Sequence, residues 1–179
     1  MKQLLGRDLD RLSWHQAEPV RLERELAAMA EVAPGLVWDP GLSAGGAWSG
    51  PLPLWPFDRA SPAGLDQAVP TPMHAIIRPF AAHPAVEPCV YPLDPSPSVA
   101  YRTAHTWHLR GDGSLCLLQV ASDWTGRDLC AQLAIKASGW YLEYRLLDAG
   151  IVSKMTLGGI AATAKYDAFL HRLIDNRAA

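Results

Sequence analysis

The sequence lacks the features that would assign it to several common classes of protein. No apolar run reaches the length of a membrane-spanning helix, and the N-terminus lacks the basic-then-apolar pattern of a secretory signal peptide. With 16 basic and 18 acidic residues, the chain also lacks the positive charge that marks nucleic-acid-binding proteins. We therefore expect a cytoplasmic protein that contacts neither a membrane nor nucleic acid.

Cysteine is scarce as well. The three cysteines, Cys89, Cys116 and Cys130, form an odd set without close pairing, which excludes a disulfide framework and fits a reducing compartment. At least one thiol is therefore free to take part in chemistry. The sequence carries no cofactor signature, and we expect neither a cofactor nor a bound metal.

Proline and tryptophan, in contrast, are plentiful. The chain has 15 prolines, which cluster between residues 34 and 97, and 7 tryptophans. Because proline interrupts helices, this half cannot be mostly helical. A length of 179 residues suits one domain with its own core and is short for two, so we expect a single domain spanning residues 1–179.

Hydrophobic periodicity predicts helices at both ends of the chain. Residues 19–33 show an amphipathic pattern that ends at Pro34-Gly35, with the apolar face formed by Leu22, Leu26 and Met29 and the polar face by Glu23, Arg24 and Glu25. Residues 126–147 show a second helical pattern, which Ser122 or Asp123 can cap and which Gly139 can interrupt. A last helix is marked by Tyr166, Phe169, Leu170 and Leu173.

Short apolar runs between these helices predict strands. They lie at residues 35–38, 73–80 and 85–91, the last paired with 99–103, and we expect Pro92, Pro95 and Pro97 to form an extended crossing outside the sheet. The expected fold class is α+β, with an N-terminal helix, an antiparallel meander of about four strands and C-terminal helices packed on the sheet.

The most informative stretch runs from His108 to Cys116. Its Gly111-Asp112-Gly113 triplet predicts a tight turn, and the apolar run that follows, residues 115–118, predicts a short strand or extended segment beside that turn. A cysteine placed there lies near the surface, where its thiol is able to react.

The surrounding pattern resembles the catalytic half of a ubiquitin-conjugating (E2) domain. Tyr91-Pro92 is followed by several prolines, then by Gly113-Ser114-Leu115-Cys116, and Trp124 follows the cysteine by eight residues, as in that family. The resemblance extends over residues 19–148 and is best between 91 and 124. It implies a UBC-like fold and a thioester-carrying cysteine at Cys116.

The chain departs from the family at one motif. The family's His-Pro-Asn triplet falls on Thr106-Trp107-His108, so that His108 occupies the place of the asparagine that stabilises the oxyanion. In this respect the chain is similar to bacterial E2-like proteins of antiviral operons. The resemblance implies an enzyme of antiphage defence that accepts a ubiquitin-like protein from an E1-like enzyme on Cys116 and transfers it to a lysine of a target protein.

The residue types suit this chemistry. A free cysteine is only a few per cent ionised at neutral pH, so a nearby cation would help, and His108 and Arg110 are the nearest candidates in the sequence. His108 could donate a hydrogen bond to the developing oxyanion or accept a proton from the amine, and His105 is the substitute if the loop is displaced.

Other interpretations remain open. Cys116 could be a small buried apolar residue, which is the role we expect for Cys89 and Cys130, and Trp124 is expected to be structural. A zinc site from His105, His108 and Cys116 lacks a paired Cys-x-x-Cys motif, and a cysteine hydrolase would need a third, orienting group that the sequence does not identify. The alternative in another class is a non-catalytic UBC-fold module that binds proteins.

Overall fold

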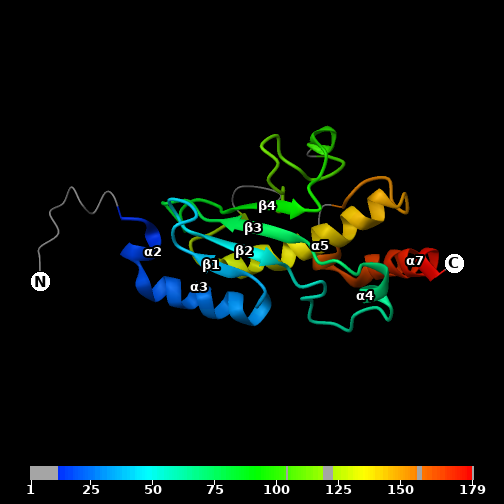
Figure 1. The fold of residues 1–179 in the computed structure, drawn as a ribbon, viewed down its shortest axis with the longest axis horizontal. Coiled ribbons are helices and arrows are strands. Elements are labelled where there is room, and N and C mark those ends of the chain that lie inside the picture. The colour runs from blue at the N-terminus through cyan, green and yellow to red at the C-terminus, as the bar shows by residue number, and fades with distance from the viewer. Residues whose placement is uncertain (1–11, 104, 119–122, 157–158, 179) are drawn as a thin grey trace, which may run out of the picture.

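The computed structural model describes residues 12–103, 105–118, 123–156 and 159–178 (Figure 1). Two helices open the described chain, α2 (Trp14–Ala17) and α3 (Pro19–Val32), and the strands β1 (Val37–Asp39), β2 (Ala47–Pro51), β3 (His74–Arg78) and β4 (Cys89–Asp94) follow, with α4 (Leu65–Ala68) between β2 and β3. The second half holds η1 (Val99–Tyr101), α5 (Cys130–Asp148), α6 (Gly159–Ala162), η3 (Ala164–Tyr166) and α7 (Asp167–Ala178). The fold class is α+β.

The four described strands form one antiparallel sheet in the order β1-β2-β3-β4, which confirms the predicted meander. Along β3, Ala75 and Ile77 are fully buried, whereas His74 at the start of the strand is exposed. One face of the sheet therefore packs on the core and the other faces outward, as antiparallel sheets allow.

Two strand predictions were wrong. Residues Val99–Tyr101 form a 3₁₀ turn instead of pairing with residues 85–91. Pro92 lies inside β4, opposite Ala75, instead of in a crossing outside the sheet. This position is tolerated because β4 is an edge strand of the described sheet, where proline's missing N–H interrupts no ladder on the outer side.

The core lies between the sheet and α5, and α3 packs against α5 (Figure 1). Side chains are buried around most of the circumference of α5, so this helix is central to the molecule instead of lying on its surface. It begins at Cys130, later than predicted, with Leu129 at its N-cap; Asp123 lies before it and Ser122 falls outside the described residues.

The expected break at Gly139 is absent, since α5 continues through it. A Cβ atom at Gly139 would lie 2.9 Å from the Cβ of Ala161 in α6. Glycine at this position therefore lets α6 pack closely against α5. The stability gained from this packing exceeds the cost of a glycine inside a helix.

The predicted polar face of α3 was wrong at one position. Glu25 is fully buried, and so is most of Arg21, whereas Glu23 and Arg24 are exposed as expected. Periodicity alone cannot show that a charged residue on the margin of the apolar face has a buried partner elsewhere in the fold.

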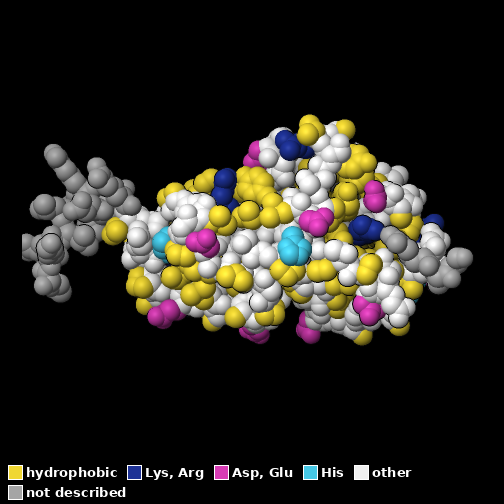
Figure 2. All heavy atoms as spheres, viewed as in Figure 1, with side chains coloured by type: hydrophobic (Ala, Val, Ile, Leu, Met, Phe, Trp, Pro, Cys, Tyr) yellow, Lys and Arg dark blue, Asp and Glu magenta, His cyan; other side chains and the backbone are white. Residues whose placement is uncertain are grey.

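Charged side chains of both signs are scattered over the face that Figure 2 shows, without a continuous patch of either sign. Among the described residues, no helix combines the length and the apolar character that a membrane crossing requires.

Candidate functional site

The segment that carries Cys116 forms a short hairpin beside the sheet. The Arg110 carbonyl accepts a hydrogen bond from the Gly113 N–H (2.9 Å), and Leu109 pairs with Leu115 in an antiparallel bridge. The Asp112 carboxylate accepts hydrogen bonds from the Ser114 N–H (2.9 Å) and hydroxyl (2.7 Å), which close the turn. The predicted turn at residues 111–113 is thus present.

This hairpin makes His108 and Cys116 neighbours. The Cys116 N–H donates to the carbonyl of His108 (2.8 Å), one step beyond the bridge between Leu109 and Leu115. Both side chains are partly buried, and both line the same cavity.

That cavity has a volume of about 540 Å³, within the usual range for ligand and active-site pockets. Its walls come from the hairpin, from α5 and from α6, so it lies where the cysteine segment meets the helical layer. Polar groups of both signs, including Asp128, Lys136 and Glu143, line it together with the apolar surface of Trp140 and Met155.

Aromatic contacts fix the loop that precedes the hairpin. Trp140 of α5 donates its indole N–H to the carbonyl of Trp107 (2.9 Å), and the Trp107 ring stacks on Tyr101 with centroids 3.9 Å apart. The Met155 N–H binds the carbonyl of Thr106 (3.0 Å). His108, which follows directly with a positive φ of 47°, is therefore attached to a rigid support.

The structure does not bring His105 to the cavity. Its side chain is exposed in the turn that precedes His108, and it is not among the described residues that line the cavity. Of the two histidines that the sequence offers, only His108 shares a surface with Cys116.

Arg110 lies within electrostatic range of the Cys116 sulfur. Burial alone would lower the pKa of Arg110, but the hydrogen bond and charge of Glu87 (2.8 Å) raise it, and the sulfurs of Cys116 and Cys89 act in the same direction. Arg110 is thus a source of positive charge near the Cys116 thiol, although Glu87 neutralises part of it.

Sequence reasoning missed Glu143. This carboxylate is 5% exposed, and its two oxygens accept hydrogen bonds from the Thr156 N–H (2.8 Å) and the Ile160 N–H (2.9 Å). Burial raises the pKa of Glu143, those hydrogen bonds oppose the rise, and the charge of His108 also lowers it. The signal for Glu143 was a single acidic residue within an otherwise apolar stretch of helix, residues 140–144.

The Tyr91 and Trp124 of the family-like pattern have structural roles. Tyr91 donates its hydroxyl hydrogen to Asp112 (3.2 Å) and accepts one from Arg78 (2.9 Å), which ties β4 to the turn. Burial, with the charge of Cys89, raises the pKa of Tyr91 to about 12. Trp124 is buried and donates its indole N–H to the carbonyl of Pro84 (2.9 Å), in agreement with the role expected for it.

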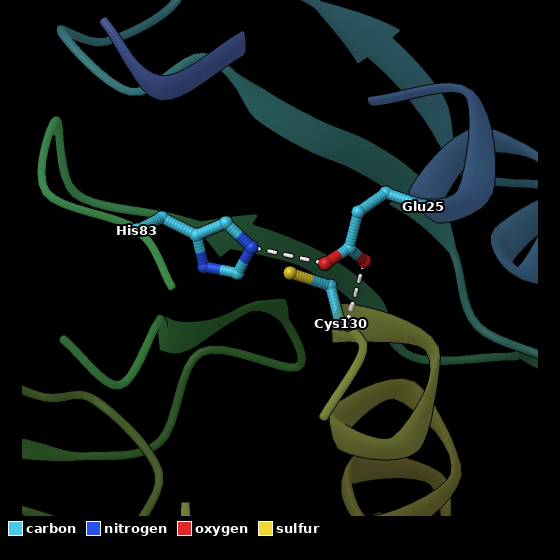
Figure 3. A group of neighbouring side chains, drawn as sticks. All are labelled: Glu25, His83 and Cys130. Carbon is cyan, nitrogen blue, oxygen red and sulfur yellow. Dashed lines mark hydrogen bonds and ion pairs between the residues drawn. The ribbon is translucent and has the colours of Figure 1, made fainter. Parts of the chain in front are cut away.

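A second cysteine, Cys130, lies in a separate buried cluster with Glu25 and His83 (Figure 3). One potential ligand atom from each residue lies within 4.8 Å of the others. His83 Nε2 lies 2.9 Å from Glu25 Oε1, and the Cys130 N–H donates to Glu25 Oε2 (2.8 Å). Burial and the Glu25 carboxylate raise the pKa of Cys130 well above its ordinary value, so this thiol stays protonated.

The two cysteine sites differ in what they can do chemically. Cys116 is accessible from a cavity that also holds an imidazole and a carboxylate, whereas Cys130 and Cys89 are buried. The expected burial of Cys89 and Cys130 is confirmed, and the role of Cys116 stays a prediction. Comparison of the chain with protein-family models, with curated proteins and with solved structures gave no match.

Proposed function

We propose that the chain is an E2-like conjugating enzyme. It accepts a ubiquitin-like protein from an E1-like enzyme as a thioester on Cys116 and transfers it to a lysine amine of a target protein. The proposed setting, bacterial antiphage defence, follows from the resemblance of the sequence to bacterial E2-like proteins.

The observation that carries the proposal is the pairing of Cys116 with His108 at the cavity. The backbone hydrogen bond between them (2.8 Å) and the cavity that both residues line support this pairing. The resemblance aligns His108 with the oxyanion-stabilising asparagine of the E2 family. A buried cysteine with no such neighbour would favour a purely structural role.

The arrangement of the elements supports the same interpretation. A helix, a four-stranded antiparallel meander, a cysteine-bearing segment and then further helices follow one another in the order that a UBC-like fold requires. The cysteine segment lies after the last strand of the described sheet and before the central helix α5, and Cys116 is partly exposed.

The proposed reaction has two acyl transfers. The Cys116 thiolate attacks the thioester carbonyl of the modifier on the E1-like enzyme, a new C–S bond forms, and the E1 thiolate leaves. A lysine amine then attacks the same carbonyl, the C–S bond to Cys116 breaks, and an isopeptide bond forms while the amine loses a proton. In this proposal His108 donates a hydrogen bond to the oxyanion or accepts that proton, and such a donor is worth roughly 3–4 kcal/mol in acyl-transfer enzymes.

The test is to incubate the protein with ATP and with the E1-like and ubiquitin-like proteins of the same operon, and to separate the products on a non-reducing gel. We expect an adduct that added thiol removes and that the Cys116→Ala variant does not form. Cys130→Ala is the matched control and should still form it. If active partners give no adduct, the carrier hypothesis fails and the non-catalytic binding module becomes the better account.

A further inference from the structure

The segment between Trp124 and α5 has no regular secondary structure, yet it contributes Asp128 to the cavity that Cys116 lines. An irregular wall needs external support if the cavity is to keep its shape. Part of this support is local, because the Asp128 carboxylate accepts hydrogen bonds from the Thr125 N–H (2.5 Å) and hydroxyl (2.7 Å). The rest comes from a distant helix, α3.

Arg21 of α3 binds the backbone of this segment at two points. Its Nη1 donates to the carbonyl of Gly126 (2.7 Å), and its Nη2 donates to the carbonyl of Asp128 (2.5 Å). A guanidinium has five N–H donors in a rigid plane, so two carbonyls held by it are also held relative to each other. Residues more than 100 positions apart in the sequence are thereby joined.

The other residues of the buried cluster keep Arg21 in place and hold the end of the segment. Glu25 Oε1 accepts from Arg21 Nη2 (3.1 Å), and Glu25 Oε2 accepts the N–H of Cys130, the first residue of α5 (2.8 Å). His83 Nε2 lies 2.9 Å from Glu25 Oε1 and 3.3 Å from Arg21 Nε, so it either donates to the carboxylate or accepts from the guanidinium, depending on the tautomer of the ring. The next residue, Pro84, holds Trp124 at the start of the segment.

Glu25, His83 and Cys130 also have the composition of a metal site, but their charges favour a different role. The Arg21 guanidinium already contacts Glu25 and lies 3.3 Å from His83 Nε2, where it supplies the positive charge that the carboxylate needs. A divalent cation, even after loss of the Cys130 thiol proton, would leave a net positive charge in a cluster without solvent access. Arg21 therefore takes the place of a cation.

We propose that Arg21, oriented by Glu25 and His83, is a positioning residue for the chemistry at Cys116. It touches no reacting atom; it fixes the backbone of residues 124–130, the segment from which Asp128 lines the cavity, so that helix α3 acts on the geometry of the site through this segment. The role in transfer rests on the function proposed above, whereas the mechanical role of the network does not.

The informative variant is Arg21→Met combined with Glu25→Gln. It removes both buried charges together, so neither is left unpaired, and the carboxamide introduced by Glu25→Gln can still accept the Cys130 N–H. What the double variant loses is the attachment of the carbonyls of Gly126 and Asp128. Arg21→Lys is the conservative variant, and Leu65→Ala, in α4, is the control for a general loss of stability because Leu65 is buried but does not line the cavity.

The first readout is hydrogen exchange of the amides in residues 126–130, measured against those of β3 in the same molecule. We expect exchange in this segment to become about tenfold faster, relative to β3, in the double variant and to stay unchanged in Leu65→Ala. Unchanged relative exchange in the double variant would overturn the proposal. So would stoichiometric zinc binding that raises the Tm of the wild-type protein and is lost in Cys130→Ala but kept in Cys116→Ala, because the cluster would then be a metal site.

The second readout links the wall to the thiol. With the modifier loaded on Cys116, discharge to free lysine should slow about tenfold in the double variant while loading changes by less than about twofold, and Arg21→Lys should recover part of the rate. An equal slowing in Leu65→Ala at the same unfolding free energy would show a merely structural role.

The two proposals can fail separately. If the wild-type protein forms no thioester, the proposed function fails, and alkylation of Cys116 by N-ethylmaleimide, followed by peptide mass spectrometry, replaces the discharge assay. Loss of the Arg21 contacts to residues 126–128 should then raise the alkylation rate of Cys116 about threefold in the double variant. The rate should stay unchanged in Leu65→Ala. Equal rates in all three proteins would overturn the positioning role whatever the function of the chain.

Discussion

The described part of the molecule contains two cysteine–histidine pairs, and their surroundings give them opposite properties. Cys130 and His83 lie in a buried cluster, where Glu25 and Arg21 form an ion pair. Cys116 and His108 lie on a hairpin at the wall of a cavity, where the thiol is partly exposed. The residue types are the same, so burial and the sign of the nearest charge decide which thiol can react.

The comparison also explains why the buried pair cannot serve as a nucleophile. The nearest charge to Cys130 is the Glu25 carboxylate, which with burial opposes formation of a thiolate, whereas the charge near Cys116 is the Arg110 guanidinium. A carboxylate beside a buried thiol favours the protonated form of that thiol. The buried pair is suited to hold the structure, and the exposed pair to carry chemistry.

The largest expected difference is in alkylation of the native protein. We expect iodoacetamide to modify Cys116 at least about 1,000-fold faster than Cys130, because Cys130 becomes accessible only when the chain opens. Peptide mass spectrometry of a time course measures both rates, and the same reaction in denaturant should modify both cysteines at similar rates. Comparable rates in the native protein would show that burial does not distinguish the reactivity of the two thiols.

The next effect is on stability. Glu25→Ala should lower the free energy of unfolding by about 3–5 kcal/mol, because it leaves the buried Arg21 guanidinium without its carboxylate. Urea denaturation measures the change. Glu23→Ala, at an exposed position of the same helix, is the matched control and should cost less than about 0.5 kcal/mol. Similar losses in the two variants would mean that the network contributes little.

These two sites mark what the sequence could and could not predict. The pattern from Tyr91 to Trp124 predicted a turn before Cys116 and a partly exposed thiol, because turn residues and local apolar runs act over a few positions. The pairing of Cys116 with His108 follows from the same hairpin, so it was within reach of local reasoning.

The buried network was not within reach, because its members come from distant parts of the chain. Periodicity placed Glu25 on the exposed face of α3, although Glu25 is buried. No residue near Glu25 in the sequence indicates its contact with His83 or the backbone carbonyls that Arg21 binds. The strand predicted at residues 99–103 failed for a related reason. Local β propensity there is overridden by the packing of Tyr101 on Trp107, which holds the segment as a 3₁₀ turn.

A smaller effect distinguishes the two histidines near Cys116. If His108 stabilises the oxyanion, His108→Ala should slow discharge of the loaded thioester to lysine about 100-fold. His105→Ala should change it by less than about twofold, because His105 is exposed and does not line the cavity. Single-turnover discharge of the preloaded protein measures both rates, and equal effects of the two substitutions would show that the hairpin pairing has no catalytic role.

The smallest expected effect is a pH dependence of stability that distinguishes two buried carboxylates. Glu25 is paired with a guanidinium, whereas Glu143 accepts hydrogen bonds from backbone N–H groups. Burial raises the pKa of Glu143 above its ordinary 4.5, so its protonated form is favoured in the folded state. The stability that this contributes is present below the unfolded-state pKa and is lost as the pH rises through the folded-state pKa. The wild-type protein should therefore lose stability relative to Glu143→Gln as the pH rises above the ordinary carboxyl pKa of 4.5, as measured by urea denaturation. A difference that stays constant, or that changes in the opposite direction, would show that the N–H groups of Thr156 and Ile160 stabilise the Glu143 carboxylate as fully as Arg21 stabilises that of Glu25.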